Sequence, residues 1–348
     1  MEILAMDLGK SNTVVCFYDS DSAKHKFGKV KTAPQQIHNL IAEHSPDRVV
    51  FEMGSATGWI YDIAMASGVE VQVANTNHHA WRWKNVKKKN DRDDALKLAQ
   101  LSAMNQLPLV HVPKRSIRQK RSLIRYRQNL VKRRTQIKNN IRAILDKEGC
   151  SMAQGKSGWS KGTLEELRKM ALPIDECDVD NLWRGQLSVE LELLESVGSC
   201  IRKIETCLDG QGKTDKQIQR LQTATGIGPR LAEAVVAFLD EPNRFKNGKQ
   251  VGSYVGLTPR QYQSGEMNHQ GKISGQGNKL LRALLVEVSW LGLRHNPWML
   301  KTYERILRGS ASRKKIAITA VARKLLVRCW AMMRDEQDWR DEKAKQVA

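Results

Sequence analysis

Four carboxylates lie at positions where a folded chain can bring them together. Asp7 and Glu52 each end a short apolar run. Asp91 and Asp94 open a predicted helix that runs to about residue 104, and their spacing of three places them on one helical face. Converging carboxylates repel one another unless a cation neutralises them, and hard oxygen ligands suit Mg²⁺ or Mn²⁺. A metal pair there would stabilise the attacking and leaving oxygens of a phosphodiester.

Each of these acids, taken alone, also has an ordinary structural explanation. A carboxylate that follows a strand is usually a turn residue, and Asp91 or Asp94 would serve as a helix cap. The joint pattern of four acids at such positions is more specific than any one of them and favours catalysis.

The elements that must position these acids form a predicted α/β domain over residues 1–112. Apolar and β-branched runs predict five strands, and amphipathic segments predict two helices between them. The strands are expected at 3–6, 13–18, 26–30, 49–51 and 69–73, and the helices at 34–41 and 57–67. The order β-β-β-α-β-α-β fits a ribonuclease-H-like fold, in which Asp7 and Glu52 would lie side by side at one edge of the sheet.

The composition points to a nucleic-acid partner. The chain has 348 residues, with 58 Lys and Arg against 37 Asp and Glu, and a formal net charge of +21. Such an excess of positive charge on a folded protein points first to nucleic acid as its partner, although a basic protein of unrelated activity would share the composition. The 41% of hydrophobic residues excludes a disordered chain. The six cysteines contain no C-x-x-C pair, which argues against zinc and disulfides.

The sequence also lacks membrane and export signals. It has no apolar run of about 18 residues, and its first residues do not have the pattern of a signal peptide. We therefore expect a cytoplasmic, nucleoid-associated bacterial protein with no membrane contact.

A basic helical region is predicted over residues 113–212. Apolar residues recur about every seven positions in a helix over 114–146 and at spacings of three and four in a second over about 187–208, as in a coiled coil or bundle. The segments between them, 149–162 and 170–183, are expected to be loops. Two features predict nucleic-acid binding. One is the set of cations on the first helix, and the other is a run of lysines that follows Trp81 and Trp83 and comes just before Asp91 and Asp94. The candidates are Lys87, Lys88, Lys89, Arg118, Arg121, Arg125, Arg133 and Arg134.

The C-terminal part, residues 213–336, is predicted to be mostly helical and to be followed by a polar tail over 337–348. It begins with a glycine turn at Gly226 and Gly228 before an apolar helix. Such a turn resembles the helix-hairpin-helix motif. In that motif the backbone N–H groups of the turn approach a phosphate closely. The same glycines can also serve only as a structural turn that ends one helix and begins the next.

Asp7-Leu-Gly-Lys, the strand-terminal Glu52 and the segment Lys89-Asn-Asp-Arg-Asp-Asp-Ala95 resemble the DEDD transposases of bacterial insertion sequences, the insertion-sequence 110 group. The resemblance implies a RuvC-like domain whose acidic tetrad is Asp7, Glu52, Asp91 and Asp94, binding Mg²⁺. The segments 255–265 and 271–282 resemble the C-terminal transposase domain of this group, and there the resemblance implies that Ser264 is the nucleophile. Serine needs a base or a metal for activation, and Ser274 is a rival candidate.

Further expectations follow from the resemblance. Arg260, Lys272, Lys279 and Arg282 would cradle phosphate near the serine. A bridge RNA made from the element would guide the enzyme to donor and target DNA, so that base pairing reads sequence while the basic protein holds backbone. A composite site from two protomers would require a homo-oligomer, a dimer or tetramer.

Two other function classes stay open on the sequence. One is a metal-dependent junction nuclease that uses the four carboxylates and water, without a covalent protein–DNA adduct. The other is a non-catalytic nucleic-acid-binding protein in which the acids are structural.

Overall fold

The computed structural model describes residues 1–75, 90–264 and 267–340. The chain forms two compact units, Met1–Arg118 and Gln119–Ala348. The predicted division into an α/β part followed by mostly helical structure is confirmed. The finer division of the second part at residue 212 stays a prediction.

The first unit is built on one five-stranded sheet. Its elements are β1 (Glu2–Leu8), β2 (Asn12–Asp19), β3 (His25–Lys31), α1 (Pro34–His44), β4 (Arg48–Glu52), α2 (Thr57–Ala66), β5 (Glu70–Ala74) and α3 (Asp91–Ala103). The strand order is β3-β2-β1-β4-β5, with β1 antiparallel to β2 and parallel to β4. The predicted order β-β-β-α-β-α-β is confirmed, and this topology fits a ribonuclease-H-like sheet.

Alternation along the strands divides the sheet into two apolar faces. On β1, Ile3 and Ala5 belong to the core shared with α3, whereas Leu4 and Met6 belong to the core shared with α1 and α2. Successive residues of a strand point to opposite faces, so this pattern assigns every other position. The sheet is thus covered by α3 on one face and by α1 and α2 on the other.

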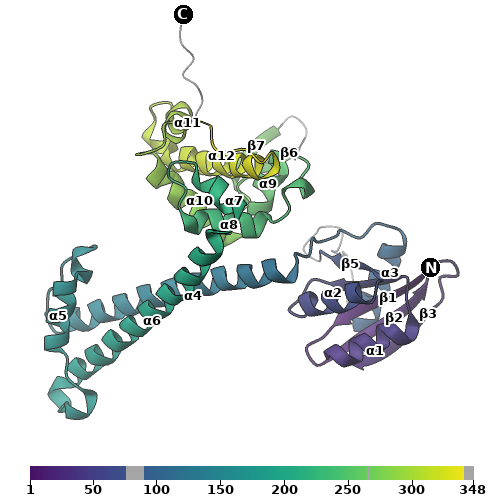
Figure 1. Cartoon of the computed structure of the whole chain (residues 1–348), viewed down its shortest axis with the longest axis horizontal. Coiled ribbons are helices and arrows are strands. Elements are labelled where there is room, and N and C mark those ends of the chain that lie inside the picture. The colour runs from purple at the N-terminus through teal and green to yellow at the C-terminus, as the bar shows by residue number, and fades with distance from the viewer. Residues whose placement is uncertain (76–89, 265–266, 341–348) are drawn as a thin grey trace, which may run out of the picture. The chain divides into compact units, whose positions relative to one another are not determined.

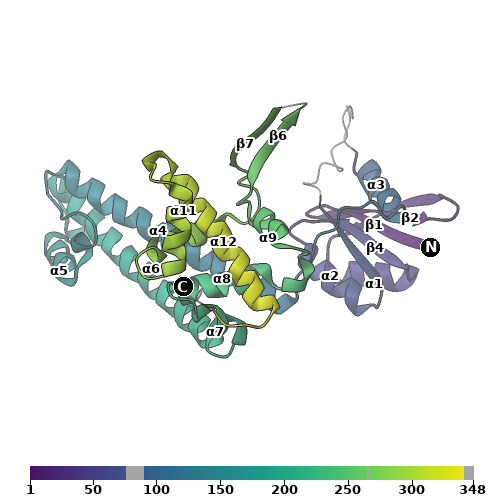
Figure 2. The ribbon, with the colours of Figure 1, turned by 90° about the horizontal axis from the view of Figure 1, so that it is seen from above.

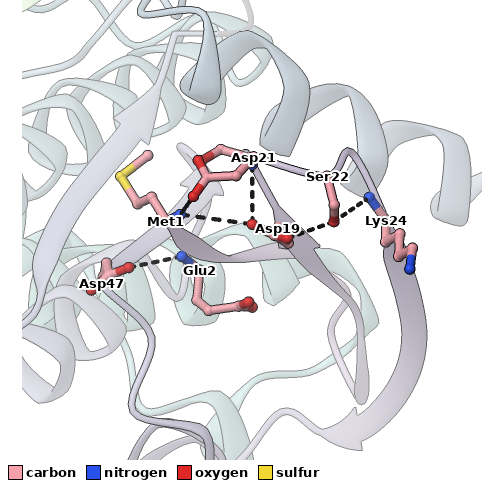
Figure 3. A network of polar contacts seen from close by, with 8 residues as sticks. Met1, Glu2, Asp19, Asp21, Ser22, Lys24 and Asp47 are labelled. Carbon is pink, nitrogen blue, oxygen red and sulfur yellow. Dashed lines mark hydrogen bonds and ion pairs between the residues drawn. The ribbon is translucent and has the colours of Figure 1, made fainter.

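Polar contacts fasten the end of the sheet at which β1 begins. Figure 3 shows the amino group of Met1 against two carboxylates, 3.1 Å from Asp21 Oδ2 and 3.7 Å from Asp19 Oδ1. The hydrogen bond to Asp21 is the main reason why the pKa of this amino group is raised. The Glu2 backbone N–H donates to Asp47 Oδ2 at 2.8 Å. These contacts lie at the opposite end of β1 from Asp7.

The second unit begins with two long helices that run side by side (Figure 1). They are α4 (Arg115–Lys147), whose first turn belongs to the first unit, and α6 (Leu182–Gly212). Between them in sequence come a short 3₁₀ helix, Ser157–Trp159, and α5 (Lys161–Met170), which packs with them in a small apolar core. The expectation of a loop over 149–162 is wrong at its end, since α5 begins at Lys161, and α5 itself was not predicted.

The remaining helices pack around a larger core. They are α7 (Lys216–Gln222), α8 (Pro229–Leu239), α9 (Gly248–Val255), α10 (Lys279–Gly292), α11 (Pro297–Leu307) and α12 (Lys314–Arg334). A two-stranded hairpin of β6 (Pro259–Ser264) and β7 (Met267–Ile273) extends from these helices (Figure 2). Trp339 lies in the predicted polar tail, yet it packs on this core, with the Arg328 guanidinium 3.7 Å from its ring centroid.

Candidate functional site

The sheet brings two of the predicted acids to adjacent positions. The last paired residues of the parallel strands β1 and β4 are Met6 and Phe51, and Asp7 and Glu52 each come one residue later. Parallel strands end at the same edge of a sheet, so both carboxylates lie at the carboxyl edge of this strand pair. The expectation that these two acids are neighbours is therefore met by the strand register.

Both acids belong to the face of the sheet that α3 covers. Asp7 has the same parity as Ile3 and Ala5, and Glu52 has the same parity as Val50, and these three apolar residues lie in the core shared with α3. Because α3 begins at Asp91, its acidic first turn is available to the same face.

Helix α3 is capped and oriented by its own residues. The Asn90 side chain accepts a hydrogen bond from the Arg92 backbone N–H, which satisfies one donor of the first turn. Asp91 is exposed at the helix start, while Asp94 is half-buried one turn later. The helix thus turns Asp94 toward the sheet and leaves Asp91 toward solvent.

Lys97 lies beside the candidate acids, although the sequence pattern did not mark it. Its side chain is buried, with 9% of its surface exposed, on the same helical face as Asp94. Burial lowers the pKa of its ammonium, and the charges of Asp94 and Glu52 oppose that shift. Strand β4 and helix α3 therefore each bring one acid near enough to Lys97 for its charge to act on the ammonium. The spacing of three between Asp91, Asp94 and Lys97 was the available signal.

The acids fit a divalent cation in chemistry, since all four are hard oxygen donors, and Asp7, Glu52 and Asp94 lie on the α3-covered face. Within residues 1–75, 90–264 and 267–340, however, no three Asp, Glu, His or Cys side chains come close enough to hold a metal ion. The buried ammonium of Lys97 supplies positive charge beside Asp94 and Glu52 in this arrangement. A closed set of metal ligands would require these side chains to draw together.

The serine predicted as nucleophile lies on the β6–β7 hairpin. Ser264 is the last residue of β6 and pairs in register with Met267. The base of the hairpin is set by glycines: Gly256 has φ +75°, and a Cβ there would lie 1.8 Å from the Gln276 carbonyl oxygen. The rival Ser274 lies at this base, where its backbone N–H donates to the Thr258 carbonyl at 2.8 Å.

The four cations predicted around the serine differ in their surroundings. Arg260, Lys272 and Lys279 are exposed. Arg282 instead donates to the carbonyls of Val255 (2.6 Å) and Gly275 (2.8 Å), which ties α10 to the hairpin base. Lys272 and Lys279 therefore face solvent, whereas Arg282 holds the loop in place and Arg260 donates to the Ser274 carbonyl at 3.3 Å.

The candidates on α4 divide in the same way. Arg118 pairs with Asp62 and donates to the Gly58 carbonyl within the first unit, and Arg121 donates to the Ala237 carbonyl at the end of α8 at 2.6 Å. The Arg125 guanidinium lies 5.1 Å from the Phe238 ring centroid. Arg133 is exposed and Arg134 lines a cavity. Lys87, Lys88 and Lys89 lie outside the described residues.

The glycine turn joins α7 to α8. Gly226 has φ +95°, and a Cβ there would touch the Gly292 Cα at 3.5 Å, so the turn packs closely on α10. Gly228 is the N-cap of α8, with open space around it. The turn leaves Gly228 accessible at a helix start, and its proposed contact with a DNA backbone stays a prediction.

A cationic hollow lies on α11 and α12. It has a volume of about 560 Å³ and, among the described residues, a lining of five cations and no carboxylate. The cations are Arg305, Arg308, Arg313, Arg323 and Lys324. Such a concave, one-sign surface attracts a polyanion. None of the helices in the described ranges has the length and apolarity that crossing a bilayer requires.

Comparison with known proteins agrees with these features. Residues 4–148 match the family model described as DEDD_Tnp_IS110, a transposase, and residues 218–304 match the model described as Transposase IS116/IS110/IS902 family. The transposase for insertion sequence element IS1111A of Coxiella burnetii is 28% identical over 98% of this chain and 92% of its own length. A putative transposase of Sinorhizobium fredii, y4rJ, is 29% identical over 94% of this chain and 90% of its own.

Similarities that cover smaller parts of the chain were also found. A pilin gene-inverting protein of Moraxella lacunata is 32% identical over 34% of this chain and 37% of its own length. The solved structure of Thermus thermophilus RuvC matches 32% of this chain and 100% of its own, at 15% identity and a TM-score of 0.24. That score is too low to define the fold, which rests on the sheet topology. Two family models of this group match the chain, one over its N-terminal part and one over its C-terminal part, and transposases align with nearly its full length. The chain therefore belongs to the IS110 family of DEDD transposases.

Proposed function

We propose that this transposase cuts and exchanges DNA strands for the transposition of an insertion sequence, using its acidic edge together with Ser264. The observation that carries the proposal is the placement of Asp7, Glu52 and Asp94 on the α3-covered face of the sheet. Carboxylates at the ends of adjacent parallel strands contribute little to a core. The common face of the three acids, and the Lys97 ammonium on which the charges of Asp94 and Glu52 act, instead favour a role in phosphoryl transfer.

The metal in this proposal is Mg²⁺ or Mn²⁺, and its ligands would be Asp7, Glu52, Asp91 and Asp94. When bound, such an ion supplies Lewis-acid stabilisation of charge on the phosphodiester oxygens. The chain itself would hold Asp7, Glu52 and Asp94 on the α3-covered face, place Asp91 one turn before Asp94, and balance the charge of the acids. Lys97 serves the last of these purposes in the arrangement described above.

The proposed covalent step uses the Ser264 hydroxyl. Its oxygen forms a bond to the phosphorus of a DNA phosphodiester, one P–O bond to the sugar breaks, and the proton of the hydroxyl ends on the leaving sugar oxygen. Attack by a sugar hydroxyl of a second strand reverses the step and returns the proton to Ser264. The hairpin that carries Ser264 also carries the exposed cations Arg260 and Lys272 at its other end, near Ser274. This supports the role in that these cations would hold the DNA backbone along the hairpin while Ser264 reacts.

The proposed nucleic-acid partners are donor and target DNA and a bridge RNA that guides the enzyme. A net charge of +21 exceeds what a short duplex contact needs, and the cationic hollow on α11 and α12 adds a second basic surface to that of the hairpin. Several basic surfaces on one chain suit an assembly of RNA and DNA whose sequence is read by pairing.

A homo-oligomer, a dimer or tetramer, is the proposed active form. Leu182, Val189 and Leu193 of α6 are 45%, 42% and 47% exposed, and their spacings of seven and four place them on one helical face. An exposed apolar stripe of this period is typical of a helix that packs against another copy. Its cellular location is proposed to be the bacterial nucleoid.

The test is a strand-exchange assay with donor DNA, target DNA, guide RNA and Mg²⁺. Asp7→Asn and Ser264→Ala are each expected to abolish exchange. The matched controls are Asp93→Asn, an exposed acid in the same turn as Asp94, and Ser274→Ala, the rival serine. Both controls are expected to retain activity.

Denaturing gels of the same reactions separate the alternatives. The proposal expects a protein–DNA adduct that is lost in Ser264→Ala and kept in Ser274→Ala. Cleavage that persists in Ser264→Ala without any adduct would instead identify a nuclease that uses water. Full exchange by Asp7→Asn would remove the acidic edge from the mechanism.

A further inference from the structure

A cavity of about 310 Å³ opens where α4, α5 and α6 meet. It lies beside the small core of this helical region, which includes Leu191 of α6 and Leu167 of α5. Neither the acidic edge nor the serine hairpin uses this cavity. It is large enough to hold one nucleotide and open enough to admit a chain.

Cations from three helices line the cavity. Arg134 and Lys138 come from α4, Arg168 from α5 and Arg202 from α6. Among the described residues, Glu195 is the one carboxylate in the lining, and it lies 3.2 Å from Arg168. The lining therefore carries an excess of positive charge that a bound anion would neutralise.

An aromatic ring forms another part of the wall. Trp159, at the end of the 3₁₀ helix, is half-buried, and the Lys138 ammonium lies 4.5 Å from its ring centroid. The Arg142 guanidinium lies 5.3 Å from the same centroid. Leu164 and Leu194 continue the apolar surface beside the ring. The cavity thus combines an aromatic and aliphatic wall with a cationic one.

The space in the cavity depends in part on Gly198. Glycine inside a helix costs about 1 kcal/mol relative to alanine, and Gly198 lies in the middle of α6. A Cβ at this position would meet the Arg202 Nη1 at 3.5 Å, an ordinary contact, so backbone crowding does not require the glycine. A longer side chain at position 198 would instead extend into the cavity.

The electrostatic surroundings of Lys138 agree with an anion site. Burial lowers the pKa of its ammonium, and the neighbouring charges of Arg134 and Arg142 lower it further. Crowded cations of this kind destabilise the empty site and are relieved by a phosphate. A flat apolar wall beside a phosphate site suits a base that stacks, which only an unpaired nucleotide can offer.

We propose that this cavity binds an unpaired nucleotide of a single-stranded nucleic acid, with the base against Trp159 and the phosphate on the cations of α4 and α6. The chemistry is common to DNA and RNA, and a displaced DNA strand and a loop of a guide RNA are both possible sources. The site is separate from the strand-exchange chemistry, and binding there does not depend on Ser264.

The experiment is photocrosslinking of the full chain to single strands that carry 5-iodouracil, followed by mass-spectrometric mapping of the crosslinked peptides. A DNA strand, an RNA strand of the same sequence and the DNA duplex form three arms. The expected crosslink lies in the peptide that contains Trp159, with either single strand and not with the duplex. The arm with the higher yield identifies the source.

Matched variants make the test specific. Gly198→Met fills the cavity without changing charge and is expected to lower the Trp159 crosslink about tenfold, the scale of one lost base stack. Lys138→Gln is expected to lower it more than Lys132→Gln, which removes an exposed cation of the same helix outside the cavity. Thermal melting of each variant establishes that α4–α6 remains folded.

Three outcomes would overturn the proposal. They are the lack of a crosslink at Trp159 with both single strands, an unchanged yield in Gly198→Met, and an equal yield with the duplex. Ser264→Ala is expected to crosslink like the unchanged chain. Loss of strand exchange with retention of this crosslink, or the reverse, therefore separates failure of the proposed function from failure of this site.

Discussion

Glu233 should make the stability of the second unit fall as pH rises through the mildly acidic range. This carboxyl lies in α8 with 3% of its surface exposed, and burial raises its pKa from 4.5 to about 7. Arg230, 3.4 Å away, opposes the shift without cancelling it. Between pH 4.5 and pH 7 the folded chain keeps a proton that the unfolded chain has lost, so the free energy of unfolding decreases with pH in this window.

The size of the effect follows from the shift. One pKa unit corresponds to about 1.4 kcal/mol, so the native state loses about 3 kcal/mol across the window, and this loss persists above pH 7. Glu233→Gln replaces the protonated carboxyl by a neutral group of the same shape. We expect the variant to match the unchanged protein near pH 4.5 and to exceed its unfolding free energy by about 2 to 3 kcal/mol at pH 8.

Urea denaturation at several pH values between 4.5 and 8, followed by far-UV circular dichroism, measures this difference. Glu241→Gln, an exposed carboxyl just beyond α8, is the matched control and should show no pH-dependent difference. The reasoning is refuted if the unfolding free energies of Glu233→Gln and the unchanged protein stay a constant distance apart over the whole pH range. It is also refuted if the unfolding free energy of Glu233→Gln falls below that of the unchanged protein as pH rises.

Two further predictions concern the acidic edge and the exposed stripe of α6. Lys97→Met removes the buried ammonium beside Asp94 and Glu52, so the metal-free protein should lose about 1 to 3 kcal/mol of unfolding free energy. Mn²⁺ should restore part of this loss in a thermal melt, and an unchanged melting temperature without metal would contradict the charge-balancing role. Val189→Glu places a charge in the exposed stripe and should lower the molecular mass measured by light scattering, whereas Val179→Glu, 85% exposed outside α6, should not. An equal mass for the two variants would exclude the stripe as the contact between copies.

The acidic edge could be predicted because its determinants are local. Apolar runs and glycine punctuation define each strand, and parity along the strand then assigns Asp7 and Glu52 to a face. Helix α5 escaped prediction because the glycines before it suggested a loop, although Ser160 caps it and Leu164 and Leu167 mark one face. The β6–β7 hairpin was also not predicted, since its strands are polar and do not alternate in the way that a half-buried strand does.

Charge density in the sequence does not distinguish a cation that binds a partner from one that holds the fold. Arg118, Arg121 and Arg282 were all candidates for nucleic-acid binding, yet each donates to backbone carbonyls of a segment distant in sequence. A guanidinium has five donors in a fixed fork and readily satisfies helix-end and loop carbonyls, and which carbonyls lie within reach is decided only by tertiary packing. Nucleic-acid contacts should therefore depend less on these three side chains than on cations such as Arg133 and Lys272, which the fold leaves exposed. The cavity beside Trp159 follows the same logic, because its cations come from three helices that no sequence period connects.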